Sequence, residues 1–308
     1  MESRMNELLL PDGTSLRALA THLYAPTAEP NGHLQVLLHG GSYDHGYWDI
    51  GTVNGRNYSY VEYMAARGYA LLAIDLPGTD GRTGGDVELD AVAKAIGGAL
   101  RRIRAGATPV PSRFATNGIS LVGHSLGGTL ATYILGHFGT ADRLVVMSTG
   151  FGPERGASFG DGQGLDARAE TYVEFPPEER AERFFYRRGV DPEVVAWDAE
   201  HLRRTVSRRL WQEAIAARND PERSGVFEVA CPTLIQLGEF DAVMPGSAAA
   251  SEAAHWRGRA EVVSIPGVGH CINHHLGHEV AWVGIDEFLL PHDDAPAATA
   301  PTTTGALQ

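Results

Sequence analysis

The sequence predicts an α/β protein with a mostly parallel central sheet, helices on both faces and one inserted helical segment. Three observations indicate this fold class. Apolar runs alternate with segments of helical spacing. The pattern Gly-His-Ser-Leu-Gly at residues 123–127 lies between one such apolar run and the helical segment that follows it. The alternation is interrupted once, at 150–225. Strands that alternate with helices pair in parallel through right-handed crossovers, which place helices on both faces of the sheet.

The first part of the chain is predicted to contain three strands and one helix. Apolar runs bounded by turn residues indicate strands at residues 16–24, 34–38 and 69–74. Between the second and the third, residues 43–56 are expected to form a long loop rich in glycine and aromatic residues, followed by a helix over 58–67. These elements begin the alternation on which the fold prediction rests.

The same alternation continues around Ser125 and resumes toward the C-terminus. Residues 86–104 have the spacing of a long amphipathic helix. Further strands are predicted at residues 119–122, 144–147, 233–237 and 261–265, and further helices at 126–135, 248–256 and 272–289. The loops that follow parallel strands gather at one edge of the sheet, where ligands bind.

The interruption of this alternation predicts an insertion. Between residues 150 and 225 there is no strand-like run, and a Gly-rich loop is followed by Arg/Glu-rich helical segments at 178–188 and 192–218. The tail is rich in Pro, Ala and Thr and has no periodicity, which predicts disorder. We therefore expect an α/β core of residues 1–149 and 226–290, a helical cap of residues 150–225 and a disordered tail of residues 291–308.

The charge of the chain restricts its partners. With 25 Lys and Arg against 38 Asp and Glu, the formal net charge is −13 at pH 7, whereas nucleic acids and anionic membrane surfaces attract clustered basic residues. No apolar run approaches the roughly 18 residues of a membrane span. We therefore expect a small-molecule substrate and neither a nucleic-acid nor a membrane partner, and homo-oligomerisation stays open.

Two further features predict a cytoplasmic location. Residues 1–12 lack the basic region, apolar stretch and cleavage site of a signal peptide. Cys231 and Cys271 are the only cysteines, so the chain has no disulfide framework of the kind found in secreted domains. No cofactor is expected, and the role of Cys271, beside a histidine of interest, stays open.

Ser125 is the candidate nucleophile. It lies between a predicted strand and a predicted helix, within the pattern at residues 123–127. Glycines two positions before and after a serine permit a sharp, strained turn that lifts the hydroxyl above the edge of the sheet. The N–H groups at the start of the helix are donors for developing negative charge. Because this five-residue pattern also arises by chance, the prediction depends on the strand and the helix predicted on either side of it.

A serine hydroxyl needs a base to take its proton and a carboxylate to orient that base. We assign His270 as the base and Asp241 as the acid, because each comes just after a predicted strand. Glu239 is the rival acid, whereas residues 148–152, after another predicted strand, contain no carboxylate. The resulting chain order is Ser, Asp, His.

Three more histidines follow His270: His274, His275 and His278. Their spacing resembles a metal-binding cluster on a helix. A solvated helix face explains the same spacing, and metal sites usually include carboxylate or thiolate ligands as well, so we predict no metal. His124, beside the candidate nucleophile, is expected to form structural hydrogen bonds.

Together these motifs resemble those of the α/β-hydrolase superfamily over roughly residues 15–290. They occur in the order of that family, each at a predicted strand end: His-Gly-Gly at 39–41, Asp-Leu-Pro-Gly at 75–78, the serine motif at 123–127, Gly-Glu-Phe-Asp at 238–241 and Gly-His at 269–270. The insertion falls where the family places its helical cap. The resemblance implies that the order Ser, Asp, His belongs to a catalytic triad.

The resemblance also implies an oxyanion hole formed by backbone N–H groups. One donor is Leu126 and the other is Gly41, with Ser42 as the alternative, because this chain has His-Gly-Gly-Ser where some lipases and esterases have His-Gly-Gly-Gly. Aromatic residues that are candidates for the substrate pocket are Tyr43, Trp48, Phe184 and Trp197.

The predicted function is that of a serine hydrolase, which cleaves an ester, lactone or thioester of a small to medium apolar molecule through an acyl-enzyme. A serine at this position argues against dehalogenase and epoxide-hydrolase chemistry, which needs a carboxylate nucleophile. The same triad also serves thioesterases or cyclases that tailor natural products and hydrolases of carbon–carbon bonds. A third alternative is a noncatalytic ligand-binding protein of the same fold.

Overall fold

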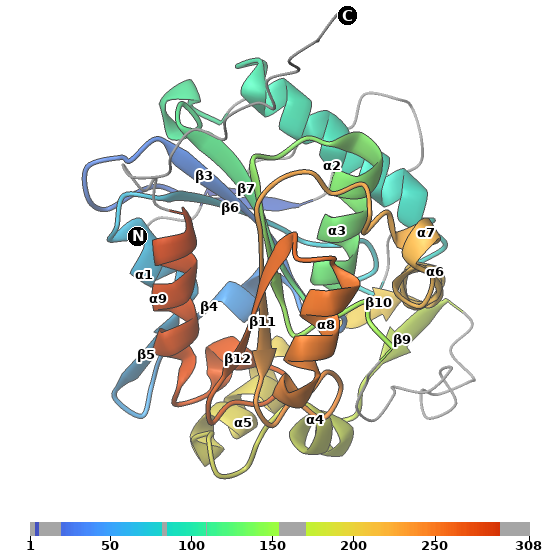
Figure 1. Ribbon diagram of the computed structural model, residues 1–308. Helices are drawn as coiled ribbons and strands as arrows, with labels where there is room; N and C mark the ends of the chain where they lie inside the picture. Colours follow the sequence, from blue (N-terminus) through green and yellow to red (C-terminus); the bar gives the residue numbers. More distant parts are fainter. Residues whose placement is uncertain (1–3, 6–19, 82–84, 109, 154–170, 290–308) are drawn as a thin grey trace, which may run out of the picture.

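The computed structural model of the chain describes residues 4–5, 20–81, 85–108, 110–153 and 171–289. An eight-stranded sheet runs through it in the order β1-β2-β6-β3-β7-β8-β11-β12 (Figure 1). Its strands are β1 (Arg4–Met5), β2 (Thr21–Tyr24), β3 (His33–Leu38), β6 (Ala70–Ile74), β7 (Gly118–His124), β8 (Arg143–Met147), β11 (Thr233–Gly238) and β12 (Ala260–Ile265). From β6 to β12 all neighbours are parallel, whereas β1 and β2 pair antiparallel at one edge. The predicted α/β class is confirmed.

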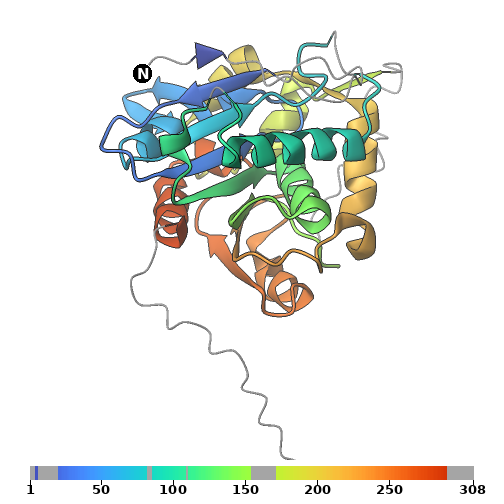
Figure 2. The ribbon, with the colours of Figure 1, turned by 90° about the horizontal axis from the view of Figure 1, so that it is seen from above.

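Helices cover both faces of this sheet. The helices of the α/β core are α1 (Tyr60–Ala65), α2 (Leu89–Arg104), α3 (Leu126–Phe138), α8 (Ala249–His255) and α9 (His278–Leu289). Helices α1 and α9 contact each other on one face, and α2, α3 and α8 lie on the other (Figures 1 and 2). Among the described helices, none combines the length and the apolar character needed to cross a bilayer.

The longest of these helices shows why its sequence folds as it does. Helix α2 buries Val92, Ile96, Leu100 and Ile103, which are spaced three or four positions apart and therefore share one face. Its last turn contains three arginines, whose positive charges favour the negative end of the helix dipole.

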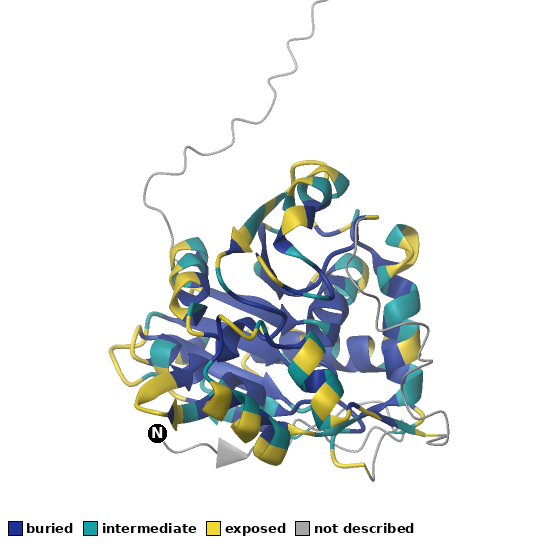
Figure 3. Cartoon of the chain, turned by 90° about the horizontal axis from the view of Figure 1, so that it is seen from below, coloured by how far each residue is buried: buried dark blue, intermediate teal, exposed yellow. Residues whose placement is uncertain are grey.

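The central strands are buried along their whole length. Every residue of β3 and β7 is buried, and Figure 3 shows the strands dark between helices whose outer faces are exposed. Two polar side chains inside these strands have partners: Tyr60 donates to Gln35 Oε1 at 2.6 Å, and His33 Nε2 lies 2.6 Å from Ser120 Oγ. Strands buried on both faces explain the continuous apolar runs in the sequence.

The loop predicted at residues 43–56 is partly wrong. A short 3-10 helix, η1 (His45–Trp48), is followed by the antiparallel hairpin β4 (Asp49–Val53) and β5 (Arg56–Ser59). Asn54 and Gly55 form its two-residue turn with φ of 49° and 77°. Positive φ at both positions is the reason that Asn-Gly favours such hairpins.

The inserted segment also differs from the prediction, because it contains two strands. Strands β9 (Tyr172–Glu174) and β10 (Thr205–Ser207) pair antiparallel. The helical part is α4 (Pro177–Arg183), α5 (Pro192–Trp197), the π-helical turn η3 (Asp198–Leu202), α6 (Arg208–Arg218) and α7 (Pro221–Ser224). The helix predicted over 192–218 is therefore interrupted by η3 and β10. Three-residue strands are too short for an alternating pattern to be recognised in sequence.

Parts of three predictions lie outside the described residues. These are residues 16–19 of the predicted strand 16–24, whose described part contains β2, the Gly-rich residues 154–170 of the predicted cap, and the predicted tail 291–308. Figure 1 shows α4 and α5 at the lower edge of the molecule, with the β9–β10 pair and α6 to their right.

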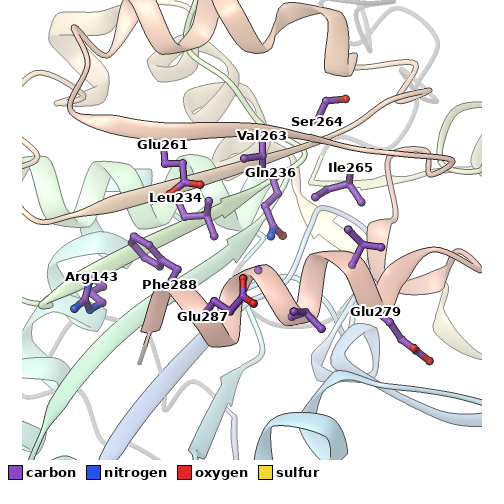
Figure 4. Close-up of a pocket in the computed structure, with 13 residues that line it drawn as sticks. Arg143, Leu234, Gln236, Glu261, Val263, Ser264, Ile265, Glu279, Glu287 and Phe288 are labelled. Carbon is purple, nitrogen blue, oxygen red and sulfur yellow. The ribbon is translucent and has the colours of Figure 1, made fainter. Parts of the chain in front are cut away.

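A groove of about 1050 Å³ lies between α9 and the strands β11 and β12 (Figure 4). Its lining includes Val263 of β12, Leu234 and Gln236 of β11, and Val283 and Phe288 of α9. None of the three residues predicted as the triad lines this groove.

Candidate active site

Ser125 occupies a strained turn between β7 and α3. Its φ of 51° is in the left-handed region, which a serine rarely adopts. Close packing explains the flanking glycines, because a Cβ at Gly123 would lie 2.3 Å from the carbonyl oxygen of Gly127, and a Cβ at Gly127 would lie 2.1 Å from that of Leu38. The turn therefore holds the hydroxyl at the carboxyl end of the central strand.

The structure brings together the three residues predicted as a triad. His270 Nε2 lies 2.9 Å from Ser125 Oγ, and His270 Nδ1 lies 3.0 and 2.9 Å from the two carboxylate oxygens of Asp241. The His270 and Asp241 side chains are almost completely buried. Ser125 Oγ, the imidazole and the carboxylate thus form one continuous hydrogen-bonded chain, the arrangement that activates a serine.

Backbone contacts fix the carboxylate of this chain. Asp241 Oδ1 also accepts hydrogen bonds from the N–H groups of Val243 and Met244, at 2.7 and 3.0 Å. The loops of Asp241 and His270 touch, because a Cβ at Gly238 would lie 2.4 Å from the carbonyl oxygen of Gly269. The parallel pairing of β11 with β12 therefore brings the acid and the base together.

Two side chains hold the backbone of His270. Its carbonyl oxygen accepts hydrogen bonds from His124 Nε2 at 3.0 Å and from Ser148 Oγ at 2.6 Å. Burial lowers the pKa of His124 well below its usual value, so this imidazole is neutral at pH 7. The structural role expected for His124 is confirmed by this contact.

The loop predicted to supply an oxyanion donor lies beside the nucleophile. A Cβ at Gly40 would be 3.3 Å from Ser125 Cβ, and the start of α3 packs against the end of β3. Gly41 and Ser42 continue this loop, and Leu126 is the first residue of α3. The N–H groups proposed to bind an oxyanion therefore come from two segments in contact.

Aromatic side chains of the inserted segment pack over the same site. The ring centre of Phe184 lies 5.5 Å from that of His270, and the Trp211 ring abuts Gly41, where a Cβ would be 2.6 Å from Cζ3. Phe175 contacts both rings, at 5.7 and 5.3 Å. The site is thus bordered by apolar side chains of the inserted segment.

The four residues predicted to line a substrate pocket do not all gather at one place, although the rings of Tyr43 and Phe184 are in contact, with centres 6.0 Å apart. Phe184 contacts His270, as described above. Tyr43 is buried and donates a hydrogen bond to Asp198 Oδ2 at 2.6 Å. Trp48 is completely buried against Tyr47 and Tyr60, and Trp197 is 38% exposed and stacks on His201. These positions support a pocket role for Phe184 and give no such support for Trp48 or Trp197.

The solvated helix face expected for His274, His275 and His278 is wrong, because all three side chains are buried. His275 Nε2 accepts hydrogen bonds from the N–H groups of Tyr186 and Gly269 at 2.9 and 3.0 Å. Burial lowers its pKa to about 4. A lone pair that already accepts two N–H donors is unavailable to a metal ion, so His275 has a structural role.

A second histidine cluster joins His22, His45 and Asp75. Their ligand atoms lie within 4.8 Å of one another, but the two imidazole rings are stacked 3.4 Å apart at an angle of 16°. Nitrogen lone pairs lie in the plane of each ring, so near-parallel rings do not converge on one ion at about 2.0–2.1 Å. Burial opposes the charge of Asp75, but hydrogen bonds from both histidines hold its pKa below the usual range. The cluster is therefore a pair of histidines bridged by the Asp75 carboxylate.

Most of the chain matches the model of a known protein family. The sequence model described as Alpha/beta hydrolase family matches residues 35–281. No curated protein matches the sequence.

Solved structures resemble this fold over most of their length. A monoacylglycerol lipase of Paleococcus ferrophilus is 17% identical with a TM-score of 0.64, covering 88% of this chain and 97% of that chain. A thermophilic esterase of Thermogutta terrifontis is 20% identical with a TM-score of 0.62, covering 93% and 98%. A hydrolase of Pseudomonas aeruginosa is 21% identical with a TM-score of 0.64, covering 93% and 98%. At these identities the likeness concerns the fold alone.

Proposed function

The chain belongs to the alpha/beta hydrolase family, and from this premise we propose that it is a serine hydrolase with Ser125 as nucleophile. Its substrate is an ester, lactone or thioester of a small to medium apolar molecule, and the reaction passes through an acyl-enzyme. The observation that carries this proposal is the hydrogen-bonded chain from Ser125 Oγ through His270 to Asp241.

In the first half of the proposed reaction, His270 Nε2 takes the proton of Ser125 as Oγ attacks the carbonyl carbon of the substrate. The carbonyl π electrons move to its oxygen, which becomes an oxyanion. Asp241 keeps Nδ1 protonated and stabilises the imidazolium that forms. When the tetrahedral intermediate collapses, the leaving group takes the proton from Nε2 and the acyl group stays on Oγ.

In the second half, His270 deprotonates a water molecule, which attacks the acyl carbon. Collapse of the second tetrahedral intermediate releases the acid and returns the proton to Ser125. Each oxyanion is bound by the N–H of Leu126, at the positive end of the α3 dipole, and by the N–H of Gly41 or of Ser42. Loss of one such donor costs about 3 kcal/mol, or on the order of a hundredfold in rate.

An apolar substrate is supported by the rings that border the site. Phe175 packs against both Phe184 and Trp211, of which Phe184 borders His270 and Trp211 borders Gly41. Apolar groups gain about 25 cal/mol for each Å² buried against such a surface. Two of the similar structures are named as a lipase and an esterase, and these names agree with an ester substrate.

We also propose that residues 150–225 act as a cap over the core and that the protein works in the cytoplasm. Cys231 and Cys271 are both free thiols, as expected in a reducing compartment. The proposed reaction needs no cofactor, because the triad completes it with its own proton transfers.

Labelling with a fluorophosphonate tests the nucleophile directly. We expect one adduct on Ser125 in the wild-type protein and none in Ser125→Ala, together with hydrolysis of short p-nitrophenyl esters that the variant loses. A preference for acyl-thioesters over these oxygen esters would favour a tailoring thioesterase instead. Absence of any adduct in folded wild-type protein would favour a noncatalytic binding protein.

A further inference from the structure

We propose that Arg180 of the cap, paired with Asp198, is a positioning residue for the loop that supplies the oxyanion donor. This inference rests on the proposed serine-hydrolase function. In this view the cap does more than border the substrate, because it holds the loop after β3 in the conformation that catalysis requires.

Arg180 lies on α4 and is completely buried. One side of its guanidinium binds Asp198, with Nε 2.8 Å from Oδ1 and Nη2 2.8 Å from Oδ2. The opposite side reaches the core, where Nη1 donates to the carbonyl oxygen of Ser42 at 3.1 Å and to its Oγ at 2.5 Å. A planar guanidinium thus connects a cap carboxylate to both oxygens of one residue of the oxyanion loop.

Ser42 needs such support because its backbone is strained. Its φ of 66° is in the left-handed region, which is unfavourable for a residue with a Cβ. The carbonyl oxygen of Ser42 also accepts a hydrogen bond from the N–H of Arg204, at 3.0 Å. Two cap residues therefore hold this carbonyl, which fixes the peptide plane after Ser42 and restrains the conformation of the loop that carries the N–H groups of Gly41 and Ser42.

The same ion pair extends to the loop of the base. The Arg180 guanidinium lies 4.3 Å from the ring centre of Tyr43, whose hydroxyl donates to Asp198 and lies 3.1 Å from Cys271 Sγ. Cys271 directly follows His270. The network therefore links the oxyanion loop, the cap and the neighbour of the base, three segments that must keep their relative positions during the reaction.

A buried ion pair is a poor stabiliser, since the desolvation of two charges offsets most of their attraction. Its value lies in fixing geometry, because the bidentate contact is lost when either side chain turns. Arg180 is also unsuited to bind an acidic substrate group, since its N–H groups already face Asp198 and Ser42. Positioning is thus the role that its contacts favour.

The test compares Arg180→Lys with wild type and with Arg183→Lys. The control residue lies on the same helix but is partly exposed and pairs with Glu179. Lysine keeps the positive charge but cannot make the two-pronged contact of the guanidinium. We therefore expect kcat of Arg180→Lys on a p-nitrophenyl ester to fall about tenfold or more. This loss should stay smaller than the roughly 10²–10³-fold loss that follows removal of an oxyanion donor. KM should stay within about threefold of wild type, and Arg183→Lys should match wild type.

A transition-state analogue separates positioning from a purely structural role. An alkylboronic acid forms a tetrahedral adduct on a catalytic serine, so its inhibition constant should rise by the same factor as kcat/KM falls. If Arg180→Lys unfolds, the pair variant Arg180→Met/Asp198→Leu, which leaves no unpaired buried charge, takes its place with the same expectation.

Two results would overturn the inference. One is a folded variant with kcat and boronate affinity within about twofold of wild type. The other is a rise in KM confined to esters with a carboxylate, which would make Arg180 a substrate-binding residue. Failure of the proposed function itself is distinct, since it would appear as full esterase activity in Ser125→Ala, whatever the Arg180 variants do.

Discussion

His270 and Asp241 are joined through both oxygens of the carboxylate, with Nδ1 3.0 Å from Oδ1 and 2.9 Å from Oδ2. The rival acid, Glu239, is engaged elsewhere, because its Oε2 accepts a hydrogen bond from the N–H of Gly267 at 2.9 Å. The two carboxylates lie two residues apart in the chain, yet only one of them contacts the imidazole.

Asp241→Asn should therefore lower kcat by about three to four powers of ten, because an amide no longer fixes the tautomer or stabilises the imidazolium. Glu239→Gln is the matched control and should keep kcat within about twofold. Steady-state kinetics on one p-nitrophenyl ester measures both. Equal losses in the two variants would contradict the assignment of Asp241.

Gly127→Ala should destabilise the protein by about 2 kcal/mol or more, as expected when a methyl group is forced into close-packed surroundings. The new Cβ would lie 2.1 Å from the backbone oxygen of Leu38, which cannot move as a side chain can. Urea unfolding measures the change. Gly98→Ala in α2 is the control, because apart from the backbone of its own helix the nearest atom to the new Cβ would be Arg101 Nη2 at 3.9 Å. This change should stabilise the protein by about 0.5–1 kcal/mol.

Phe184→Leu should change the acyl preference of the enzyme. Its ring borders His270, so the smaller side chain should alter the ratio of kcat/KM between short and long p-nitrophenyl esters by about threefold to tenfold. Trp197→Ala should leave this ratio unchanged, because that ring is 38% exposed and stacks on His201. If Trp197→Ala changed this ratio and Phe184→Leu did not, the pocket role would belong to Trp197 and not to Phe184.

Stability should fall as the pH drops from about 6.5 toward 4, because buried neutral histidines resist protonation more than exposed ones. Burial lowers the pKa of His33 and His275 to about 4 and that of His274 to about 3. The unfolded chain therefore binds protons first, so the stabilisation is complete above pH 6.5 and declines below it.

Urea unfolding at pH 7.5 and at pH 5 checks this dependence. His275→Gln removes one such group, so its loss of stability between the two values should be smaller than that of wild type, even if the variant is less stable at both. His201→Gln, in which the replaced histidine is exposed, should lose as much as wild type. An identical loss in His275→Gln would show that His275 does not contribute.

Sequence patterns were sufficient for the parallel α/β order and for the positions of Ser125, Asp241 and His270 at strand ends, because hydrophobic periodicity and glycine-bounded turns are local. The sequence did not determine which of Asp241 and Glu239 meets the imidazole. That contact depends on how the loops after β11 and β12 pack against each other.

Only the tertiary structure decided which polar residues are buried. His274, His275 and His278 have the spacing of an exposed helix face, and Arg180 stands in an Arg/Glu-rich helical pattern, yet all four are buried. The paired strands β9 and β10 likewise join segments about thirty residues apart. Burial and strand pairing of this kind depend on contacts between segments that are distant in the sequence. A local pattern of residues does not predict those contacts.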